Sequence, residues 1–131
     1  MPDESAPGPG FDGLRVLLVE DEMLVAMIIE DMLAEMGCSV IGPAARVAEA
    51  LILIDRETFD IAVLDVNVAG DVVTPVAEVL EQRGVPFVFS TGYRARELPE
   101  RFQKHTLVQK PYRDADLRRA LGEALANASA S

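Results

Sequence analysis

The chain has 131 residues, enough for one domain, and half of them are hydrophobic, enough for one core. Its formal net charge of −10, from 22 acidic against 12 basic residues, argues against a nucleic-acid-binding surface, which depends on Lys and Arg contacts to phosphates. No apolar run approaches the roughly 18 residues of a membrane-spanning helix, the first residues lack the features of a signal peptide, and the single cysteine, Cys38, excludes an internal disulfide and fits the cytoplasm.

Strand-like and helix-like patterns alternate between two terminal segments that are expected to be disordered. Residues 1–12 are rich in Pro, Gly and acidic residues, and residues 127–131 form a small-residue tail, so the domain is placed at residues 13–126. In chain order, the predicted strands are Arg15–Val19, Cys38–Ile41, Asp60–Leu64, Pro86–Ser90 and Leu107–Gln109. The predicted helices are Glu22–Met36, Val47–Arg56, Thr74–Gln82, Glu97–Phe102 and Asp114–Leu125. Gly37 and Gly84 follow the first and third helices, as glycine commonly does.

Three of the predicted strands are continuous apolar runs. Val16–Val19, Ile61–Leu64 and Phe87–Phe89 do not alternate with polar residues, which indicates strands buried on both faces of a parallel sheet. Strand–helix alternation with short links gives right-handed crossovers. The predicted fold is α/β, a flavodoxin-like, doubly wound, five-stranded parallel sheet with helices on both faces. The strand order 2-1-3-4-5 comes with that fold rather than from this chain.

Four of the strands are followed by hydrophilic, chemically capable residues. These are Glu20 and Asp21 after the first strand, Asp65 after the third, Thr91 after the fourth and Lys110 after the fifth. The carboxyl ends of parallel strands form one rim of the sheet, and ligands bind at that rim. Three carboxylates, a hydroxyl and an ammonium group together suit a divalent cation beside a phosphoryl group.

The carboxylates by themselves point to Mg²⁺. Like charges in a cleft raise one another's pKa unless a cation relieves the repulsion, and Mg²⁺ prefers oxygen ligands and needs few carboxylates. Glu20 and Asp21 as a pair have a plain alternative, because acidic residues are also favoured at a solvated helix start. The residues at the other strand ends weaken that alternative.

Four short motifs, in this order, resemble the receiver domain of bacterial two-component response regulators. They are Val19-Glu20-Asp21-Glu22, Leu64-Asp65-Val66-Asn67, Ser90-Thr91-Gly92-Tyr93 and Gln109-Lys110-Pro111-Tyr112. The resemblance covers Leu14 to about Leu125. It implies a single-domain response regulator that acts as a signalling switch or phosphorelay carrier and is not an enzyme.

The resemblance also implies a role for each matching acidic residue. Asp65 corresponds to the phosphoacceptor, which takes a phosphoryl group from a histidine kinase or a histidine phosphotransfer protein in a Mg²⁺-dependent reaction. Asp21 and Asp65 would bind the metal directly, together with the backbone carbonyl of Asn67. Glu20 would act mainly through metal-bound water.

The same resemblance assigns the residues that would meet the phosphoryl group. Lys110 would hold a phosphoryl oxygen as a compact cation, and Thr91 would hydrogen-bond to the group. Gly92 would leave room for the donor, and the bond from Lys110 to Pro111 would be cis, a form nearly confined to proline. Taken singly, Thr91 has the plain reading of a turn residue and Lys110 that of a surface lysine.

Two features depart from the usual receiver pattern. Leu107 stands where the family usually has an aromatic residue, three positions before the lysine, and Tyr93 is a candidate to replace it. The segment between Thr91 and Lys110 is short and has little apolar periodicity, which predicts a short or mobile fourth helix.

The first helix has more apolar residues than one buried face needs. Met23, Leu24 and Met27 are left over, and they suit either an adaptable docking surface or a wide helix–sheet contact.

Two other functions compete with the receiver interpretation. A haloacid-dehalogenase-like phosphatase would also use an Asp nucleophile, but it needs a second Asp two residues later, where this chain has Asn67, and usually a cap domain. A degenerate receiver or a flavin-binding module is the other alternative. The retained site residues argue against degeneracy, and the acidic turn after the first strand argues against a flavin phosphate.

Overall fold

The computed structural model describes residues 11–92, 95–103 and 105–130. Its main sheet consists of β1 (Arg15–Val19), β2 (Ser39–Ala44), β3 (Ile61–Asp65), β6 (Phe87–Thr91) and β7 (Leu107–Gln109). Its helices are α1 (Met23–Glu35), α2 (Val47–Arg56), α3 (Thr74–Gln82), α4 (Glu100–Gln103) and α5 (Asp114–Ala130), with a 3₁₀ turn, η1 (Ala95–Glu97). A small hairpin joins β4 (Asn67–Val68) to β5 (Asp71–Val72).

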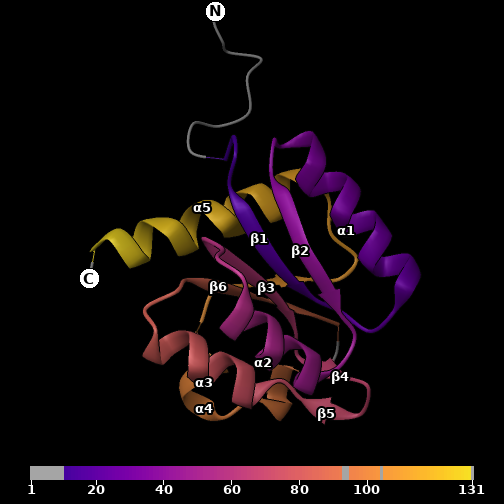
Figure 1. The fold of residues 1–131 in the computed structure, drawn as a ribbon, viewed down its shortest axis with the longest axis vertical. Coiled ribbons are helices and arrows are strands. Elements are labelled where there is room, and N and C mark those ends of the chain that lie inside the picture. The colour runs from indigo at the N-terminus through magenta and orange to yellow at the C-terminus, as the bar shows by residue number, and fades with distance from the viewer. Residues whose placement is uncertain (1–10, 93–94, 104, 131) are drawn as a thin grey trace, which may run out of the picture.

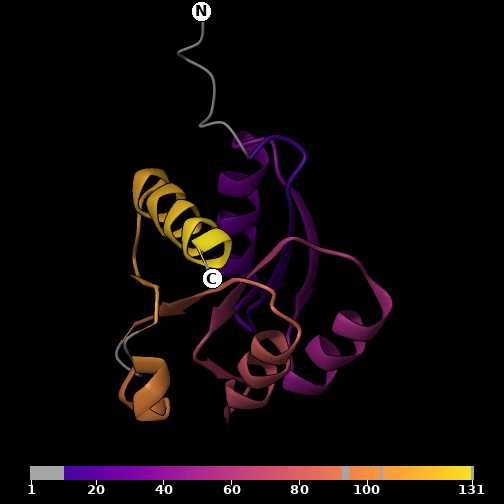
Figure 2. The same cartoon turned by 90° about the vertical axis from the view of Figure 1, so that its left-hand side faces the viewer.

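The five main strands are parallel and lie in the order β2-β1-β3-β6-β7. Counted along the sheet strands alone, this is the predicted order 2-1-3-4-5, and the predicted doubly wound fold is confirmed. Helices α1 and α5 cover one face of the sheet, and α2 and α3 cover the other (Figures 1 and 2).

The core has two layers, one on each face of the sheet. On β1, Leu17 and Val19 point into the layer under α2 and α3, whereas Val16 and Leu18 point into the layer under α1 and α5. All four side chains are fully buried. A strand buried on both faces explains why its apolar run is continuous.

Several boundaries differ from the sequence predictions. Phe11 is 5% exposed and packs in the layer under α1 and α5, so ordered packing begins inside the segment expected to be disordered. Helix α5 continues to Ala130 through the expected tail, because alanine is the best helix former. Strand β2 passes through a cis Gly42–Pro43 bond to Ala44 instead of ending at Ile41.

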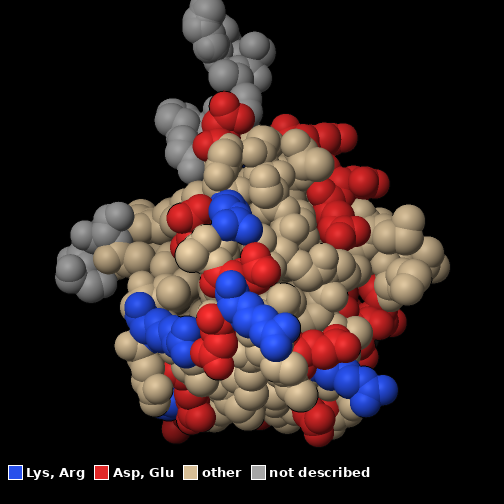
Figure 3. Space-filling model, in the orientation of Figure 1, with Lys and Arg blue, Asp and Glu red and all other residues tan. Residues whose placement is uncertain are grey.

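Charged side chains of both signs are interspersed on the face shown in Figure 3, where the basic groups stand among acidic ones. Exposed ion pairs of this kind join Arg83 to Asp55, and Arg101 to Glu78 and Glu81. Among the described residues, no helix has the length and apolar character needed to cross a membrane.

Candidate phosphoryl and metal site

The strand ends bring the predicted residues together. Asp65 ends β3, Thr91 ends β6, Glu20 and Asp21 follow β1, and Lys110 follows β7. Ligand oxygens of the three carboxylates all lie within 4.8 Å of one another. A cavity of about 380 Å³ opens at this rim of the sheet. Its lining consists of Asp21, Glu22, Asp65, Asn67, Thr91, Gly92 and Lys110.

Glu20 is the most enclosed of the three carboxylates, with only 2% of its surface exposed. Its Oε1 accepts a hydrogen bond from Lys110 Nζ at 2.9 Å, and its Oε2 accepts one from the backbone N–H of Glu22 at 3.1 Å. A buried carboxylate is tolerated when its charge is paired and its oxygens are hydrogen-bonded. Glu20 meets both conditions.

Lys110 lies between two carboxylates. Its Nζ is 2.9 Å from Glu20 Oε1 and 3.5 Å from Asp65 Oδ2, so Glu20 is the closer partner. Burial opposes the charge on Lys110, but the hydrogen bond to Glu20 and the charges of Asp65 and Glu20 outweigh it and raise the pKa of the ammonium group. Lys110 is therefore a fixed positive charge at this site, and the alternative reading as a surface lysine is wrong.

Asp65 is a carboxyl group that resists ionisation in this surrounding. Burial is the main cause, the charge of Glu20 adds to it, and together they raise the pKa of Asp65 to about 7, although Lys110 acts in the opposite direction. An added cation would favour the ionised form. The site thus has negative charge in excess of what Lys110 balances.

Thr91 is buried, and its Oγ1 has no hydrogen-bond partner among the described residues. Buried hydroxyl groups are normally satisfied, so an orphaned one at the edge of a cavity is available to a group that enters the cavity. The backbone around it is fixed, because Thr91 O accepts a hydrogen bond of 2.7 Å from the N–H of Lys110. Thr91 is therefore placed to donate a hydrogen bond into the cavity.

Asp21 and Asn67 are tied to the β4–β5 hairpin, which the sequence analysis did not predict. Asp21 Oδ2 accepts a hydrogen bond of 2.9 Å from the N–H of Ala69, at the hairpin tip. Asn67 Oδ1 accepts one of 3.2 Å from the N–H of Gly70, and Asn67 Nδ2 donates to Glu97 of η1 at 3.1 Å. Ala69-Gly70 between two short strands was the only sequence signal for this turn, and it is weak.

The remaining predicted residues have mixed outcomes. Gly92 lines the cavity, and the bond from Lys110 to Pro111 is cis, as expected. Leu107 lies on β7 with 39% of its surface exposed. Tyr93 lies outside the described residues. Tyr112 was not singled out as a site residue, but its hydroxyl is 3.5 Å from Ser90 Oγ, next to Thr91, and burial raises its pKa to about 12.

The surplus apolar residues of α1 are exposed. Met23, Leu24 and Met27 have between 52% and 77% of their surface accessible, which rules out a wide helix–sheet contact, and Ile28 of the same helix is 56% exposed. Beside them lies an apolar cavity of about 150 Å³. Its walls come from Val25, Ile28, Ile29 and Met32 of α1 and from Lys110, Pro111 and Tyr112. We call this whole area the α1 apolar surface, and Lys110 connects it to the carboxylate site.

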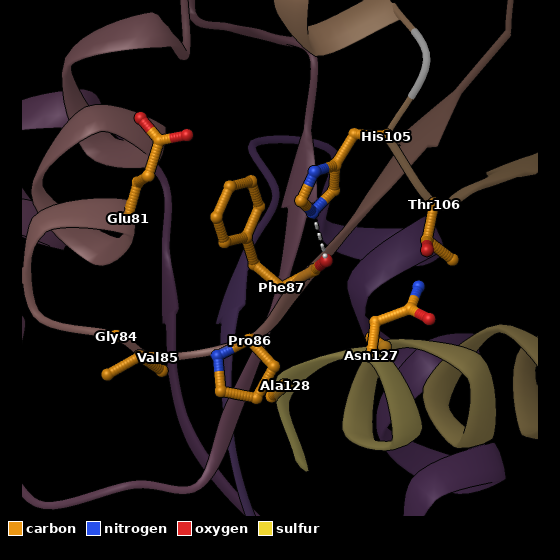
Figure 4. Close-up of a pocket in the computed structure, with 10 residues that line it drawn as sticks. Glu81, Gly84, Val85, Pro86, Phe87, His105, Thr106, Asn127 and Ala128 are labelled. Carbon is orange, nitrogen blue, oxygen red and sulfur yellow. Dashed lines mark hydrogen bonds between the residues drawn. The ribbon is translucent and has the colours of Figure 1, made fainter. Parts of the chain in front are cut away.

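A third cavity, of about 280 Å³, lies at the amino-terminal end of β6 (Figure 4). There the rings of His105 and Phe87 stack with centroids 4.2 Å apart, and His105 Nε2 is 3.0 Å from the carbonyl oxygen of Phe87. Burial lowers the pKa of His105. Because Phe87 begins the strand that Thr91 ends, this cavity is at the opposite rim from the predicted residues and is not the candidate site.

The sequence of this chain is similar to those of known signalling proteins. The model of the response regulator receiver domain family matches residues 16–122. The transcriptional regulatory protein PdtaR of Mycobacterium tuberculosis is 32% identical over 107 residues, which is 79% of this chain and 52% of PdtaR. The phyllosphere-induced regulator PhyR of Methylorubrum extorquens is 31% identical over 85% of this chain and 43% of its own. This chain therefore spans about half the length of these curated relatives.

Among solved structures, that of SdrG from Sphingomonas melonis Fr1 is 38% identical to this chain, with a TM-score of 0.79. The match covers 86% of this chain and 97% of SdrG.

Proposed function

This chain belongs to the response regulator receiver domain family, and from that premise we propose that it accepts a phosphoryl group on Asp65. The donor is a histidine kinase or a histidine phosphotransfer protein, and the domain acts as a signalling switch or a phosphorelay carrier. Receiver domains are phosphoacceptor signalling domains, not enzymes, so the phosphatase alternative falls. The observation that carries the proposal is the position of Asp65, at a strand end between two carboxylates and an ammonium group.

The donor set of the cavity fits Mg²⁺. Three carboxylates with ligand oxygens within 4.8 Å of one another, and a single ammonium group among them, leave an excess of negative charge that a hard divalent cation relieves. Asp21 and Asp65 would hold the ion directly, together with the backbone carbonyl of Asn67. Glu20 would act through water, since both of its oxygens are already engaged. When bound, Mg²⁺ supplies positive charge beside the transferring phosphoryl group.

In the transfer step, Asp65 acts as the nucleophile in its ionised form. One carboxylate oxygen forms a bond to phosphorus while the bond from phosphorus to the donor's imidazole nitrogen breaks, and that nitrogen keeps the electron pair. The product is an acyl phosphate on Asp65. Because the pKa of Asp65 is about 7, its carboxyl group must lose its proton before it can attack phosphorus.

Two neighbours then receive the phosphoryl oxygens. Lys110 Nζ is 3.5 Å from Asp65 Oδ2 and keeps its charge, so it can pair with an oxygen of the new group. Thr91 Oγ1 gains the hydrogen-bond acceptor that it lacks among the described residues. Thr91 ends β6, the strand beside β3, and Lys110 follows β7, the strand beyond it, so the phosphoryl group would draw the ends of both strands towards Asp65.

The phosphodonor docks on the α1 apolar surface. Met23, Leu24 and Met27 form an exposed, adaptable patch, and the adjoining cavity is walled partly by Lys110 and Pro111. A partner on this surface lies next to the carboxylate site, as a donor side chain must. Exposed apolar patches of this kind mark interaction sites.

We also propose that the domain works in the cytoplasm, because histidine kinases present their phosphorylated domains there.

Phosphorylation by a small acyl-phosphate donor tests the proposal without a partner. The protein is incubated with Mg²⁺ and acetyl phosphate, and intact mass is measured. We expect the wild-type chain to gain one phosphoryl group, Asp65→Asn to gain none, and wild type with EDTA to gain none. Asp71→Asn is the matched control, because Asp71 is an exposed carboxylate on the neighbouring hairpin and its loss should leave labelling intact. Labelling of Asp65→Asn at wild-type level would refute the assignment.

A further inference from the structure

The tip of the β4–β5 hairpin has an unusual backbone. Its two-residue turn places Ala69 at φ 52° and Gly70 at φ 90°. Positive φ at both positions is the pattern of a type I′ turn, in which asparagine, aspartate or glycine is the usual first residue. Ala69 is the only residue other than glycine with positive φ in the described part of the chain. An alanine held in this region by its surroundings invites a functional explanation.

The turn points a backbone N–H at a carboxylate of the site. Ala69 N donates to Asp21 Oδ2 at 2.9 Å, across 48 residues of sequence. The side chain of Asn67 closes the turn, because its Oδ1 accepts a hydrogen bond of 3.2 Å from Gly70 N. A hydrogen bond of 2.8 Å from Val73 N to Val66 O fixes the base of the hairpin. The direction of the Ala69 N–H therefore follows from the hairpin and not from Asp21 itself.

Asp21 is the carboxylate that most needs such a contact. Glu20 is buried and bonded at both oxygens, and Asp65 is partly buried beside Lys110. Asp21 is exposed, and among the described residues the Ala69 N–H is the only hydrogen-bond donor to it. An exposed aspartate without a partner samples several rotamers. The bond at Oδ2 fixes the carboxylate and leaves Oδ1 available.

We propose that the Ala69–Gly70 turn is a positioning device for the metal ligand Asp21, with the backbone N–H of Ala69 as the group that orients it. The inference rests on the proposed function, in which Asp21 binds Mg²⁺. Groups that orient a metal ligand raise metal affinity because the ligand need not be ordered when the ion binds. Ala69 is thus a positioning residue that contributes through its backbone, and its side chain has no part in the contact.

An amide-to-ester substitution at Ala69 tests this directly. Replacing Ala69 with its α-hydroxy acid exchanges the N–H for an oxygen and keeps every side chain. Mg²⁺ affinity is measured by calorimetry and by NMR shifts of the site. We expect the ester to weaken Mg²⁺ binding by about 10-fold, at the lower end of the range for such supporting contacts because Asp21 is exposed. Ala69→Gly keeps the N–H and should bind within about twofold of wild type.

A pair of glycine variants separates positioning from general stability. Gly70 and Gly84 both have positive φ, at 90° and 72°, and a Cβ added at either one would touch nothing within 4 Å. Ala at each position therefore strains the backbone without a steric clash. Gly84 follows α3 and lines the cavity at the opposite rim of the sheet. Gly70→Ala should weaken Mg²⁺ binding several-fold, whereas Gly84→Ala should leave it unchanged although both variants lose stability.

The outcomes distinguish failure of the proposed function from failure of the positioning role of Ala69 alone. If wild type shows no Mg²⁺-dependent shifts at Asp21 and Asp65, the proposed function fails. If wild type binds Mg²⁺ and the ester binds it equally well, the positioning role alone is refuted. Tighter binding by the ester would also refute it, because the Ala69 N–H would then compete with the metal for Asp21.

Discussion

Lys110 Nζ is closer to Glu20 than to Asp65, at 2.9 Å against 3.5 Å. The family resemblance assigned Lys110 to the phosphoryl group and Glu20 to metal-bound water, so no sequence pattern indicated that these two residues would pair. In this structure the ammonium group neutralises a carboxylate that is almost fully buried. Under the proposed function, Lys110 would share its charge between Glu20 and the phosphoryl group, and both the stability and the chemistry of the site would depend on it.

Replacing Lys110 with Met should destabilise the fold. Glu20 would remain buried without its cation, and the loss of one partner of a buried pair costs about 3–5 kcal/mol of unfolding free energy. Chemical denaturation measures this, and added Mg²⁺ should restore part of the loss. Arg83→Met is the control, because its pair with Asp55 is exposed and its loss should cost less than about 1 kcal/mol. Equal effects of the two variants would contradict a structural role for Lys110.

Asp65 should make stability depend on pH. Its pKa is about 7 in the folded chain against 3.8 ordinarily, so the fold binds this proton more tightly than the unfolded chain does. The unfolding free energy therefore falls as pH rises from about 4 to about 7 and is level above. Asp65→Asn removes the penalty. The variant should be more stable than wild type by about 1–3 kcal/mol at pH 8 without metal, with the difference shrinking towards pH 4. A pH-independent difference would contradict the raised pKa.

Mg²⁺ affinity should fall in acid for the same reason. A metal ion and a proton compete for Asp65, so below pH 7 the apparent affinity should drop by up to about tenfold per pH unit. Above about pH 8 it should be level. Calorimetric titration across this range measures the slope, with Asp71→Asn as a control that should follow wild type. A flat profile between pH 5 and 7 would contradict this competition, either because the pKa of Asp65 is not raised or because Asp65 is not a ligand.

The segment from η1 to α4 should respond to activation. Helix α4 has only four residues, and its hold on the sheet comes mainly from the buried side chains of Leu98 and Phe102. So short a helix should exchange its amide hydrogens quickly in the resting state. With Mg²⁺ and beryllofluoride as a phosphoryl mimic, exchange over residues 95–103 should slow, because Thr91 and Lys110 on either side of the segment are drawn to one group. Slow exchange before activation, with no change after it, would place the response elsewhere.

The α1 apolar surface should affect transfer from a protein donor and not from a small one. Leu24→Glu or Met27→Glu should slow phosphorylation by a histidine kinase about tenfold or more, as expected for a contact at the centre of an interface. Phosphorylation by acetyl phosphate should be unchanged, because Leu24 and Met27 do not line the carboxylate cavity. Ile52→Glu, on the other face of the sheet, is the control, since Ile52 is similarly exposed. Equal loss with both donors would indicate damage to the site instead.

The sequence predicted the strands, and their ends to within one residue except for β2, because that information is local. A continuous apolar run followed by Asp65 or Thr91 fixes both the strand and the rim on which the side chain lies. It did not predict the pairing of Lys110 with Glu20, which depends on rotamers and on burial that only the packed sheet creates. The β4–β5 hairpin was missed because two-residue strands have no periodicity. Helix α5 was ended too early because its alanines resemble a flexible tail in composition.

The burial of Cys38 makes α4 available for site-specific labelling through an introduced cysteine. Its thiol is buried, its Sγ lies against the carbonyl oxygen of Phe11, and burial raises its pKa, so it stays protonated and shielded at neutral pH. A maleimide or nitroxide reagent should therefore react first with a cysteine introduced at an exposed position such as Glu100. A variant with that one added cysteine can thus carry a spectroscopic reporter on α4 without removal of Cys38.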